Sequence, residues 1–324
     1  MIVTLTLNPG LDLTYSLTES FVGAVDVHRA ATATLEASGK GVNVSRALHS
    51  NGIDTIAVLP LGGSTGHHLA ELLDTEGVTH RSVAQQAATR VNTTMAVRGG
   101  STAKVNGPGG RLTSDDVEAL KVEVAGALGE ATDDDEVWLA VCGSLPPGLD
   151  PAVVGEFVAL AHAHEALCAL DSSGEALAAA ISAGADLLAP NRLELAEVDP
   201  RAAAAHTLED LAAIAAEIAR DRGTSLLVSL GEDGALYTEG DVVVHGHGPE
   251  LTPVNTAGAG DALLSGWLAQ AAAPADRMAR AIRWSRAACL SATTVAPALT
   301  DPPDTPDGVT VHTLPIRRPE RSTS

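Results

Sequence analysis

The segment NTAGAGDALLSG, residues 255–266, joins a glycine-rich turn, an aspartate and an apolar helix. Gly258, Ala259 and Gly260 are small, so the backbone N–H groups at the helix start can point into open space and bind an anion. Asp261 follows in the first turn, where two roles are open to it. A carboxylate there stabilises the helix through its dipole, as an ordinary cap does. The alternative is a catalytic base beside an anion-binding helix end.

The segment SGKGVNVSRAL, residues 38–48, has a similar design at another expected helix start. Gly39 and Gly41 flank Lys40, and Asn43 follows in the first turn. A helix start that carries Lys and Asn can hold a polyhydroxy or phosphorylated ligand. An ordinary glycine-rich loop is the alternative, and the segment alone does not decide between them.

Polar residues also follow other expected strands. GSLPPG exposes Ser144 at a strand end, and DSSG, residues 171–174, is placed in the same way. Asn191 and Glu194, in PNRLE, have the i, i+3 spacing that puts two oxygen ligands on one helical face, which suits Mg²⁺ directly or through water. The standard nucleotide motifs are absent, because there is no GxxxxGKS/T and GAGDAL has Leu263 where GxGxxG needs its last glycine.

The composition limits the partners. The chain has 324 residues and is 45% hydrophobic, which is enough for a core without disulfides or metals. Its formal charge is −21, from 41 acidic and 20 basic residues. This field repels nucleic acids and anionic membranes, so we expect neither as a partner. It also repels an anionic substrate, so a phosphate site has to rest on local Lys, Arg and backbone N–H groups.

The cysteines and the N-terminus indicate a cytoplasmic protein. Cys142, Cys168 and Cys289 are widely spaced, form no CxxC pair and lie in apolar runs, as expected in a reducing compartment. The first residues, MIVTLTLNPG, lack the features of a signal peptide, and no apolar run approaches about 18 residues. We therefore expect no export and no membrane anchor.

Strand-like and helical patterns alternate along the chain, which predicts an α/β fold with a mostly parallel sheet covered on both faces. Ligands then belong at the carboxyl ends of the strands. The expected strands are 2–7, 55–61, 137–142, 166–171, 187–189 and 225–230, with a hairpin at 235–245; the expected helices are 41–52, 66–76, 114–131, 151–165 and 207–222, with others beginning at 174, 260 and 276.

Two stretches break this alternation, and a proline-rich tail follows it. Residues 12–35 are rich in β-formers, and residues 91–106 alternate polar and apolar side chains around a Gly-Gly turn. Both are predicted to be antiparallel strands outside the main sheet, forming a small lid over the strand ends. The proline-rich residues 301–324 are predicted to be a surface loop followed by a disordered tail.

Together these motifs resemble those of the ribokinase-like (PfkB-type) carbohydrate kinases, whose C-terminal signature is similar to NTAGAGDALLSG. The resemblance runs from about residue 2 to residue 297. LNPGLDLTY, GKGVN, TRVNTT with the later KVN, GSLPPG and DSSGEAL are most similar to the phosphosugar branch, which contains 1-phosphofructokinase, tagatose-6-phosphate kinase and the minor 6-phosphofructokinase. LNP, GKGVN and KVNGPG favour the first of these. The implied fold is one ribokinase-like domain over residues 1–300, a three-layer α/β/α sandwich with a mostly parallel central sheet and a small β-strand lid.

The resemblance implies ATP-dependent phosphorylation of a ketohexose phosphate, with fructose 1-phosphate converted to fructose 1,6-bisphosphate as the leading expectation. Tagatose 6-phosphate and fructose 6-phosphate are the alternative substrates, and a silent sugar-phosphate sensor is the alternative outside enzymes. Asp261 would be the base, beside an anion hole at Gly258, Ala259 and Gly260. The implied sugar-phosphate ligands are Asp12, Gly39 and Asn43 at the hydroxyls, and Lys40, Arg90, Arg29, Lys104 and Ser144 around the phosphate.

The same resemblance implies how ATP and Mg²⁺ are held. Asn191 and Glu194 match the NxxE motif of the family and would organise Mg²⁺ through water. Ala189 departs from the family, because related phosphofructokinases often carry Lys there, which leaves the nucleotide-phosphate contacts open. Substrate binding would close the lid and exclude water, and the exposed lid strands predict a homodimer. The expected nucleotide ligands are Asn191, Ser229, Gly231 and Gly234.

Overall fold

The structure is a computed structural model, and it describes residues 1–18, 27–97, 102–132, 136–298 and 308–315. The strands from β11 to β5 in its main sheet run parallel, and the last three at the other edge are antiparallel, which confirms the predicted mostly parallel sheet. In the described residues the order is β14 (Thr310–Thr313), β13 (Val242–His247), β12 (Ala235–Glu239), β11 (Ser225–Ser229), β10 (Leu187–Leu188), β9 (Leu167–Asp171), β8 (Trp138–Cys142), β1 (Ile2–Leu5), β4 (Thr55–Leu61) and β5 (His80–Ala84).

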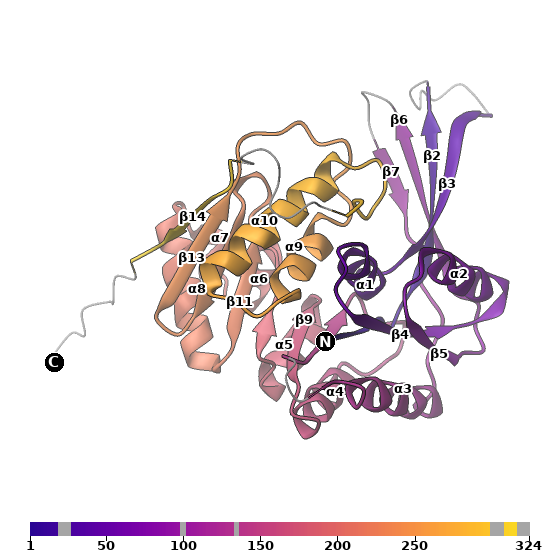
Figure 1. The fold of residues 1–324 in the computed structure, drawn as a ribbon, viewed down its shortest axis with the longest axis horizontal. Coiled ribbons are helices and arrows are strands. Elements are labelled where there is room, and N and C mark those ends of the chain that lie inside the picture. The colour runs from indigo at the N-terminus through magenta and orange to yellow at the C-terminus, as the bar shows by residue number, and fades with distance from the viewer. Residues whose placement is uncertain (19–26, 98–101, 133–135, 299–307, 316–324) are drawn as a thin grey trace.

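Helices cover both faces of this sheet, so the fold is the predicted three-layer sandwich (Figure 1). One face is covered by α3 (Ser114–Leu128), α4 (Ala152–Ala163), α5 (Gly174–Ala183), α6 (Arg192–Val198), α7 (Arg201–Ala204) and α8 (Leu208–Arg222). The other is covered by α1 (Lys40–Ser50), α2 (Gly63–Glu76), α9 (Ala259–Leu268) and α10 (Pro274–Leu290).

Alternation in the central strands supplies a core to both helix layers. In β1, Val3 and Leu5 pack with the α3 and α4 side, whereas Ile2 packs with the α1 and α9 side. Successive side chains of a strand point to opposite faces, so a strand buried on both sides reads as a continuous apolar run. The central strands are therefore packed between two helix layers, and polar residues at their ends are held in fixed positions.

A second sheet stands apart from the body and forms the lid (Figure 1). Its order is β3 (Ala30–Ser38), β2 (Gly10–Leu17), β6 (Arg90–Val97) and β7 (Thr102–Val105). The prediction of antiparallel strands within each stretch is confirmed by β2–β3 and β6–β7, and the two stretches join through β2 and β6, which pair parallel. This pairing follows from the chain order, because β2 comes after β1 and β6 comes after β5. Since β1 and β5 point in the same direction in the main sheet, β2 and β6 also start from its carboxyl ends in the same direction. The expected Gly-Gly turn lies outside the described residues.

The sequence did not indicate the strands at either edge of the main sheet. β5 extends one edge beyond β4, and β14 lies within the predicted loop and tail, where it pairs antiparallel with β13. The tail prediction is therefore wrong for residues 310–313, while 299–307 and 316–324 lie outside the described residues. In the described ranges, no helix combines the length and apolar character needed to cross a membrane.

Candidate active site

A cavity of about 530 Å³ opens where the parallel strands end beneath the lid sheet. The body contributes residues that follow β1, β8, β9 and β10, and the lid contributes residues of β2, β6 and β7. Carboxyl ends of parallel strands are the usual ligand position in such folds. The segments with expected functional residues therefore meet at one place. The residues that line the cavity include Asn8, Asp12, Lys40, Asn43, Arg90, Lys104, Ser144, Asp171, Asn191, Glu194, Gly258, Gly260 and Asp261.

Helix α9 begins at this cavity in the geometry of an anion hole. Gly258 is its N-cap and has a φ of 78°, and a Cβ there would lie 2.3 Å from the carbonyl oxygen of Thr294. A Cβ on Gly260 would meet nothing within 4 Å, so this side of the helix start is open. The first N–H groups of a helix have no partner within the helix. The N–H of Ala259 makes only a long bond of 3.4 Å, to the carbonyl oxygen of Thr256, and the N–H groups that follow are available to an anion in the cavity.

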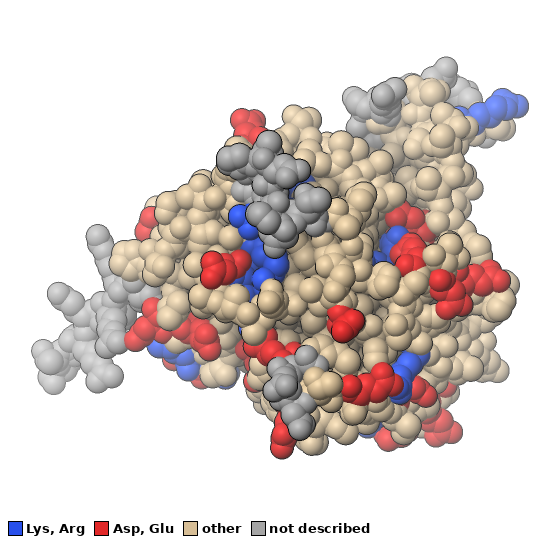
Figure 2. Space-filling model, viewed as in Figure 1, with Lys and Arg blue, Asp and Glu red and all other residues tan. Residues whose placement is uncertain are grey.

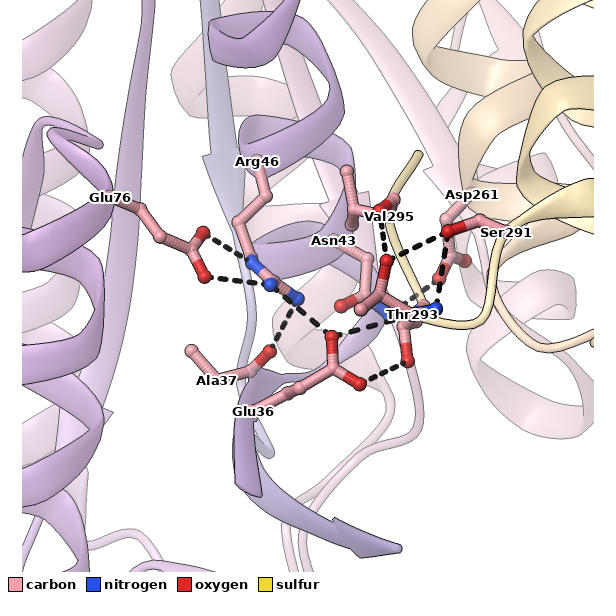
Figure 3. A network of polar contacts seen from close by, with 10 residues as sticks. Glu36, Ala37, Asn43, Arg46, Glu76, Asp261, Ser291, Thr293 and Val295 are labelled. Atoms are coloured by element: carbon pink, nitrogen blue, oxygen red, sulfur yellow. Dashed lines mark hydrogen bonds and ion pairs between the residues drawn. The ribbon is translucent and has the colours of Figure 1, made fainter. Parts of the chain in front are cut away.

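Asp261 lies in the first turn of α9 but does not cap it. Its Oδ2 accepts a hydrogen bond of 2.8 Å from Nδ2 of Asn43 on α1 (Figure 3). Burial and the negative charge of Asp171 raise the pKa of Asp261 to about 7, against the lowering effects of Asn43 and Lys40. The carboxyl group can therefore gain and lose a proton near neutral pH, which a general base needs.

Lys40 begins α1 and points to the end of β9. Its Nζ lies 2.7 Å from Oδ1 of Asp171, an ion pair that the sequence did not indicate. Burial acts to lower the pKa of Lys40, but the charges of Asp171, Asp261 and Glu194 outweigh it, so the pKa is raised and the ammonium stays charged. Gly39 precedes it with a φ of 125°, which favours glycine at this turn.

The lid contributes a second group of polar side chains. Asp12 on β2 is buried, and its Oδ1 accepts a 2.7 Å hydrogen bond from Nδ2 of Asn92 on β6. Nζ of Lys104 lies 3.9 Å from Oδ2 of Asp12. Arg90 donates from Nη1 to the carbonyl oxygen of Gly107 at 3.1 Å. Asp12 is thus held in place before any ligand arrives, which favours binding.

Two polar atoms of residues lining this cavity are buried without a hydrogen-bond partner among the described residues: Oδ1 of Asn43 and Nε of Arg90. Buried polar atoms are nearly always paired, so each of these two atoms has hydrogen-bonding capacity left beside the cavity. One is an acceptor, suited to a sugar hydroxyl, and the other is a charged donor, suited to a phosphate oxygen.

The charged side chains that line the cavity are of both signs, whereas the sequence predicts a cluster of cations there. The cavity lining holds three cations, Lys40, Arg90 and Lys104, but also four carboxylates. Lys40 and Lys104 both lie beside a carboxylate, whereas Arg90 donates to a carbonyl oxygen. Acidic side chains are also spread over the face of the molecule in Figure 2. Among these three cations, Arg90 is therefore the one without a carboxylate in direct contact.

Asn191 and Glu194 line the cavity, but not as two ligands on one helical face. Asn191 is the N-cap of α6, and its Oδ1 accepts from the N–H groups of Leu193 and Glu194 at 2.8 and 3.0 Å. Oε2 of Glu194 accepts from the N–H of Asn191 at 2.8 Å, which completes a capping box. The i, i+3 spacing thus has a structural function that the sequence analysis missed. It leaves Oε1 of Glu194 outside the cap.

A second cavity, of about 410 Å³, adjoins the first on the far side of the start of α9. The two share Ser229, Gly260 and Leu263. Gly231 and Gly234, two of the expected nucleotide ligands, line the second cavity together with Ala259 from the expected anion hole. Its other wall was not predicted, because these residues are scattered over α10 and the loop between β13 and α9 without a motif. They include Leu251, Pro253, Ile282, Ser285, Arg286 and Cys289.

Arg29 is the one expected ligand that the structure places elsewhere among the described residues. It is exposed beside β3 and does not line the cavity. Ser144 does line it, and its Oγ lies 3.3 Å from the donating Nδ2 of Asn8. The sequence analysis missed Asn8, Asn92 and Thr294, although Asn8 and Asn92 lie in the quoted motifs LNPG and RVNTT. Only the folded chain shows that they face the cavity.

Comparison with known proteins agrees with this geometry. Residues 11–302 match the family described as pfkB family carbohydrate kinase. The chain belongs to the PfkB family. A 1-phosphofructokinase of Haloferax volcanii is 38% identical over 272 residues, which cover 83% of each chain. The ATP-dependent 6-phosphofructokinase isozyme 2 of Escherichia coli is 32% identical over 81% of this chain and 83% of its own.

The solved structures extend the agreement to three dimensions. Phosphofructokinase-2 from Escherichia coli, in complex with substrates and products, superposes with a TM-score of 0.83 at 30% identity, covering 91% of this PfkB-family chain and 95% of its own. Both cavities lie almost wholly within the matched residues 11–302, with Asn8 just before them. This protein is therefore a carbohydrate kinase, a phosphotransferase with an alcohol group as acceptor.

Proposed function

We propose that this PfkB-family kinase transfers the γ-phosphoryl group of ATP to the 6-hydroxyl of fructose 1-phosphate, giving fructose 1,6-bisphosphate and ADP. The observation that carries the proposal is the Asp261 carboxyl, which is buried at the first cavity next to Gly260, a residue that both cavities share, and has its pKa raised to about 7. The choice of sugar is supported by the relatives named 1-phosphofructokinase from Haloferax volcanii and Vibrio cholerae, at 38% and 31% identity.

In the proposed reaction Asp261 accepts the proton of the attacking hydroxyl. The hydroxyl oxygen bonds to the γ-phosphorus as the bond from that phosphorus to the β–γ bridging oxygen breaks, and ADP leaves. The N–H of Gly260 stabilises the negative charge on the transferred oxygens, and that of Ala259 joins it by giving up its 3.4 Å bond to the Thr256 carbonyl oxygen. Asn43 fixes the orientation of the base through its bond to Oδ2, so Oδ1 faces the substrate.

The opposite end of the sugar is held by the basic residues. Arg90 presents an unpaired Nε to the phosphate, and Lys40, Lys104 and Ser144 complete the proposed phosphate site. The sugar hydroxyls are assigned to Asp12, to Oδ1 of Asn43 and to the backbone at Gly39, all of which line the same cavity. We leave Arg29 out of this site, because it does not line the cavity of its own chain.

We assign ATP to the second cavity, with its phosphates at Ser229 and the start of α9 and its base against the wall from α10. Mg²⁺ is proposed as the cofactor, and when bound it would neutralise charge on the transferring phosphates. The side chains fit a hydrated ion, because Glu194 keeps one carboxylate oxygen outside its capping box. Mg²⁺ commonly keeps several waters and takes one or two carboxylates plus substrate phosphates. Asn191 would act by holding Glu194.

The lid supports a proposed homodimer. Several large apolar side chains of the lid region are exposed, including Val27, Leu35, Val91 and Val105. An exposed apolar patch beside free strand edges favours pairing with a second copy. We also infer that the enzyme works in the cytoplasm, since its cysteines are free and two of the three are buried as ordinary core residues.

The shape of the sugar leaves one alternative substrate class, a ketohexose 6-phosphate. A ketohexose furanose carries a CH₂O arm on each side of its ring oxygen, so one pocket can grip a phosphate at either end and present the other hydroxyl to Asp261. The similarity to a 6-phosphofructokinase at 32% identity specifically favours fructose 6-phosphate as the second candidate.

The test is a comparison of kcat/KM for fructose 1-phosphate, fructose 6-phosphate and tagatose 6-phosphate, each at saturating ATP. We expect the highest value for fructose 1-phosphate. A higher value for either 6-phosphate reassigns the substrate. Binding of sugar phosphate without ATP consumption on any of the three would instead favour the silent sensor.

A further inference from the structure

A buried ion cluster lies between the lid sheet and the two helices at its base (Figure 3). The Arg46 side chain, on α1, is 7% exposed, and its guanidinium contacts both α2 and β3. Its Nε and Nη2 donate to Glu76, at the end of α2, over 2.6 and 2.7 Å. Nη1 donates to the carbonyl oxygen of Ala37 at 2.9 Å, and Nη2 lies 3.4 Å from Oε1 of Glu36. Glu76 thus takes the two short ionic bonds, and Glu36 has capacity left for other donors.

Glu36 uses this capacity on a loop that follows α10. Its Oε1 accepts from the backbone N–H of Thr294 at 3.3 Å, and its Oε2 lies 3.4 Å from Oγ1 of the same residue. The loop keeps its shape through bonds from Thr293 to Ser291 and Val295. The Glu36 carboxylate therefore connects the lid sheet to a segment that is 258 residues away in the sequence.

The two ends of this connection are both parts of the proposed site. Glu36, on β3, is the direct cross-strand partner of Asp12 on β2, the residue proposed to bind a sugar hydroxyl. At the other end, the backbone of Thr294 lies against Gly258, so closely that a Cβ on Gly258 would be 2.3 Å from the Thr294 oxygen. Thr294 also lines the sugar cavity. A contiguous path thus runs from the sugar-binding strand to the anion hole.

We propose that Glu36 is a positioning residue. Through its bonds to Thr294 it fixes the position of the anion hole at the start of α9 relative to the lid sheet, which holds the sugar. The inference rests on the proposed function for its kinetic consequence. Hydrogen bonds of 3.3 and 3.4 Å are long and contribute little to global stability. Their loss is therefore expected to shift the hole rather than unfold the protein, and misplacement by about 1 Å can cost about 100-fold in rate.

The experiment combines kinetics with hydrogen exchange on purified full-length variants. Glu36→Gln keeps the shape of the side chain but weakens the bonds to Thr294, and Thr294→Val removes the Oγ1 contact. Each is expected to lower kcat by about 10-fold while the KM for ATP changes less than about twofold, and the double variant should be no slower than the worse single variant. Backbone amides in residues 258–262 should exchange about 10-fold faster in Glu36→Gln without ligand.

The matched control is Glu76→Gln, which loosens the same Arg46 on the side away from Thr294. We expect it to lower the melting temperature while kcat and exchange in residues 258–262 stay at wild-type values. Additive losses in the double variant, or wild-type exchange and kcat in Glu36→Gln, would overturn the inference. Wild-type protein that phosphorylates none of the three ketohexose phosphates would refute the proposed function, and the exchange measurement would still decide the role of Glu36.

Discussion

Replacing Asp261 by Asn removes a proton acceptor and keeps almost everything else at the start of α9. The new amide has the size of the carboxyl group, and its oxygen can still accept the 2.8 Å bond from Asn43. Its NH₂ group then faces the substrate hydroxyl and offers a donor where the reaction needs an acceptor. We expect kcat to fall by about 10²–10⁴-fold, the usual contribution of a positioned general base, with both substrates still bound.

The pH dependence of the wild-type enzyme gives an independent measure of the same group. Burial and the charge of Asp171 raise the pKa of Asp261 to about 7, so the carboxylate form is lost as the pH falls through neutrality. In the free enzyme, kcat/KM should therefore fall about tenfold for each pH unit below about 7 and level off above it. The Asn variant should lack this acidic limb.

The assay follows ADP release with a coupled enzyme, alongside calorimetric binding of ATP and sugar phosphate. Far-ultraviolet circular dichroism and the melting temperature check that the variant is folded. An Asp261→Asn protein that binds both substrates and keeps more than about a tenth of wild-type kcat would refute the base assignment, since a base should contribute more than this.

Three further substitutions test the two sides of the site. Arg90→Ala should raise the KM for the sugar phosphate by about 10–100-fold with little change for ATP, because a charged hydrogen-bond partner of the phosphate is lost; an unchanged sugar KM places Arg90 outside the site. Lys104→Ala should act in the same direction but more weakly, because its side chain is 44% exposed and pairs loosely with Asp12; an effect larger than that of Arg90→Ala would contradict this ranking. Gly258→Ala should lower both kcat and the melting temperature, because φ is 78° and the added Cβ would meet a carbonyl oxygen at 2.3 Å. Its control is Gly240→Ala, which has a φ of 56° but an open surrounding, and should lower the melting temperature less without changing kcat.

The sequence predicted the main architecture and the central residues of the cavity for one physical reason. Glycine-rich turns and polar residues directly after buried strands collect at one edge once the strands are parallel. Ser144 directly follows the parallel strand β8, whereas Lys40, Asn43 and Asp261 lie at the glycine-rich starts of α1 and α9, and all four line one cavity. Local pattern and chain topology together are enough to bring such residues to the same edge.

The remaining features depend on contacts between segments that no local pattern records. The pairing of Lys40 with Asp171 requires knowing that the start of α1 faces the end of β9. The NxxE spacing fits both a metal site and a capping box, and only the backbone conformation at Asn191 reveals the box. The wall of the second cavity from α10 consists of ordinary helix residues, which look like core in the sequence. Arg29 was expected from the family resemblance alone, but it lies just before β3 and does not line the cavity.

The short strand β14 has a consequence for the solubility of shortened versions of this protein. The family match ends at residue 302, yet Thr310–Thr313 pairs with β13 and forms the outermost strand of the main sheet. Ending the chain at the family boundary would leave β13 with a row of unpaired N–H and C=O groups next to three consecutive valines, residues 242–244. Such an edge is a template for strand addition by another molecule. Shortened protein is therefore expected to self-associate through this edge even where the catalytic cavities are intact.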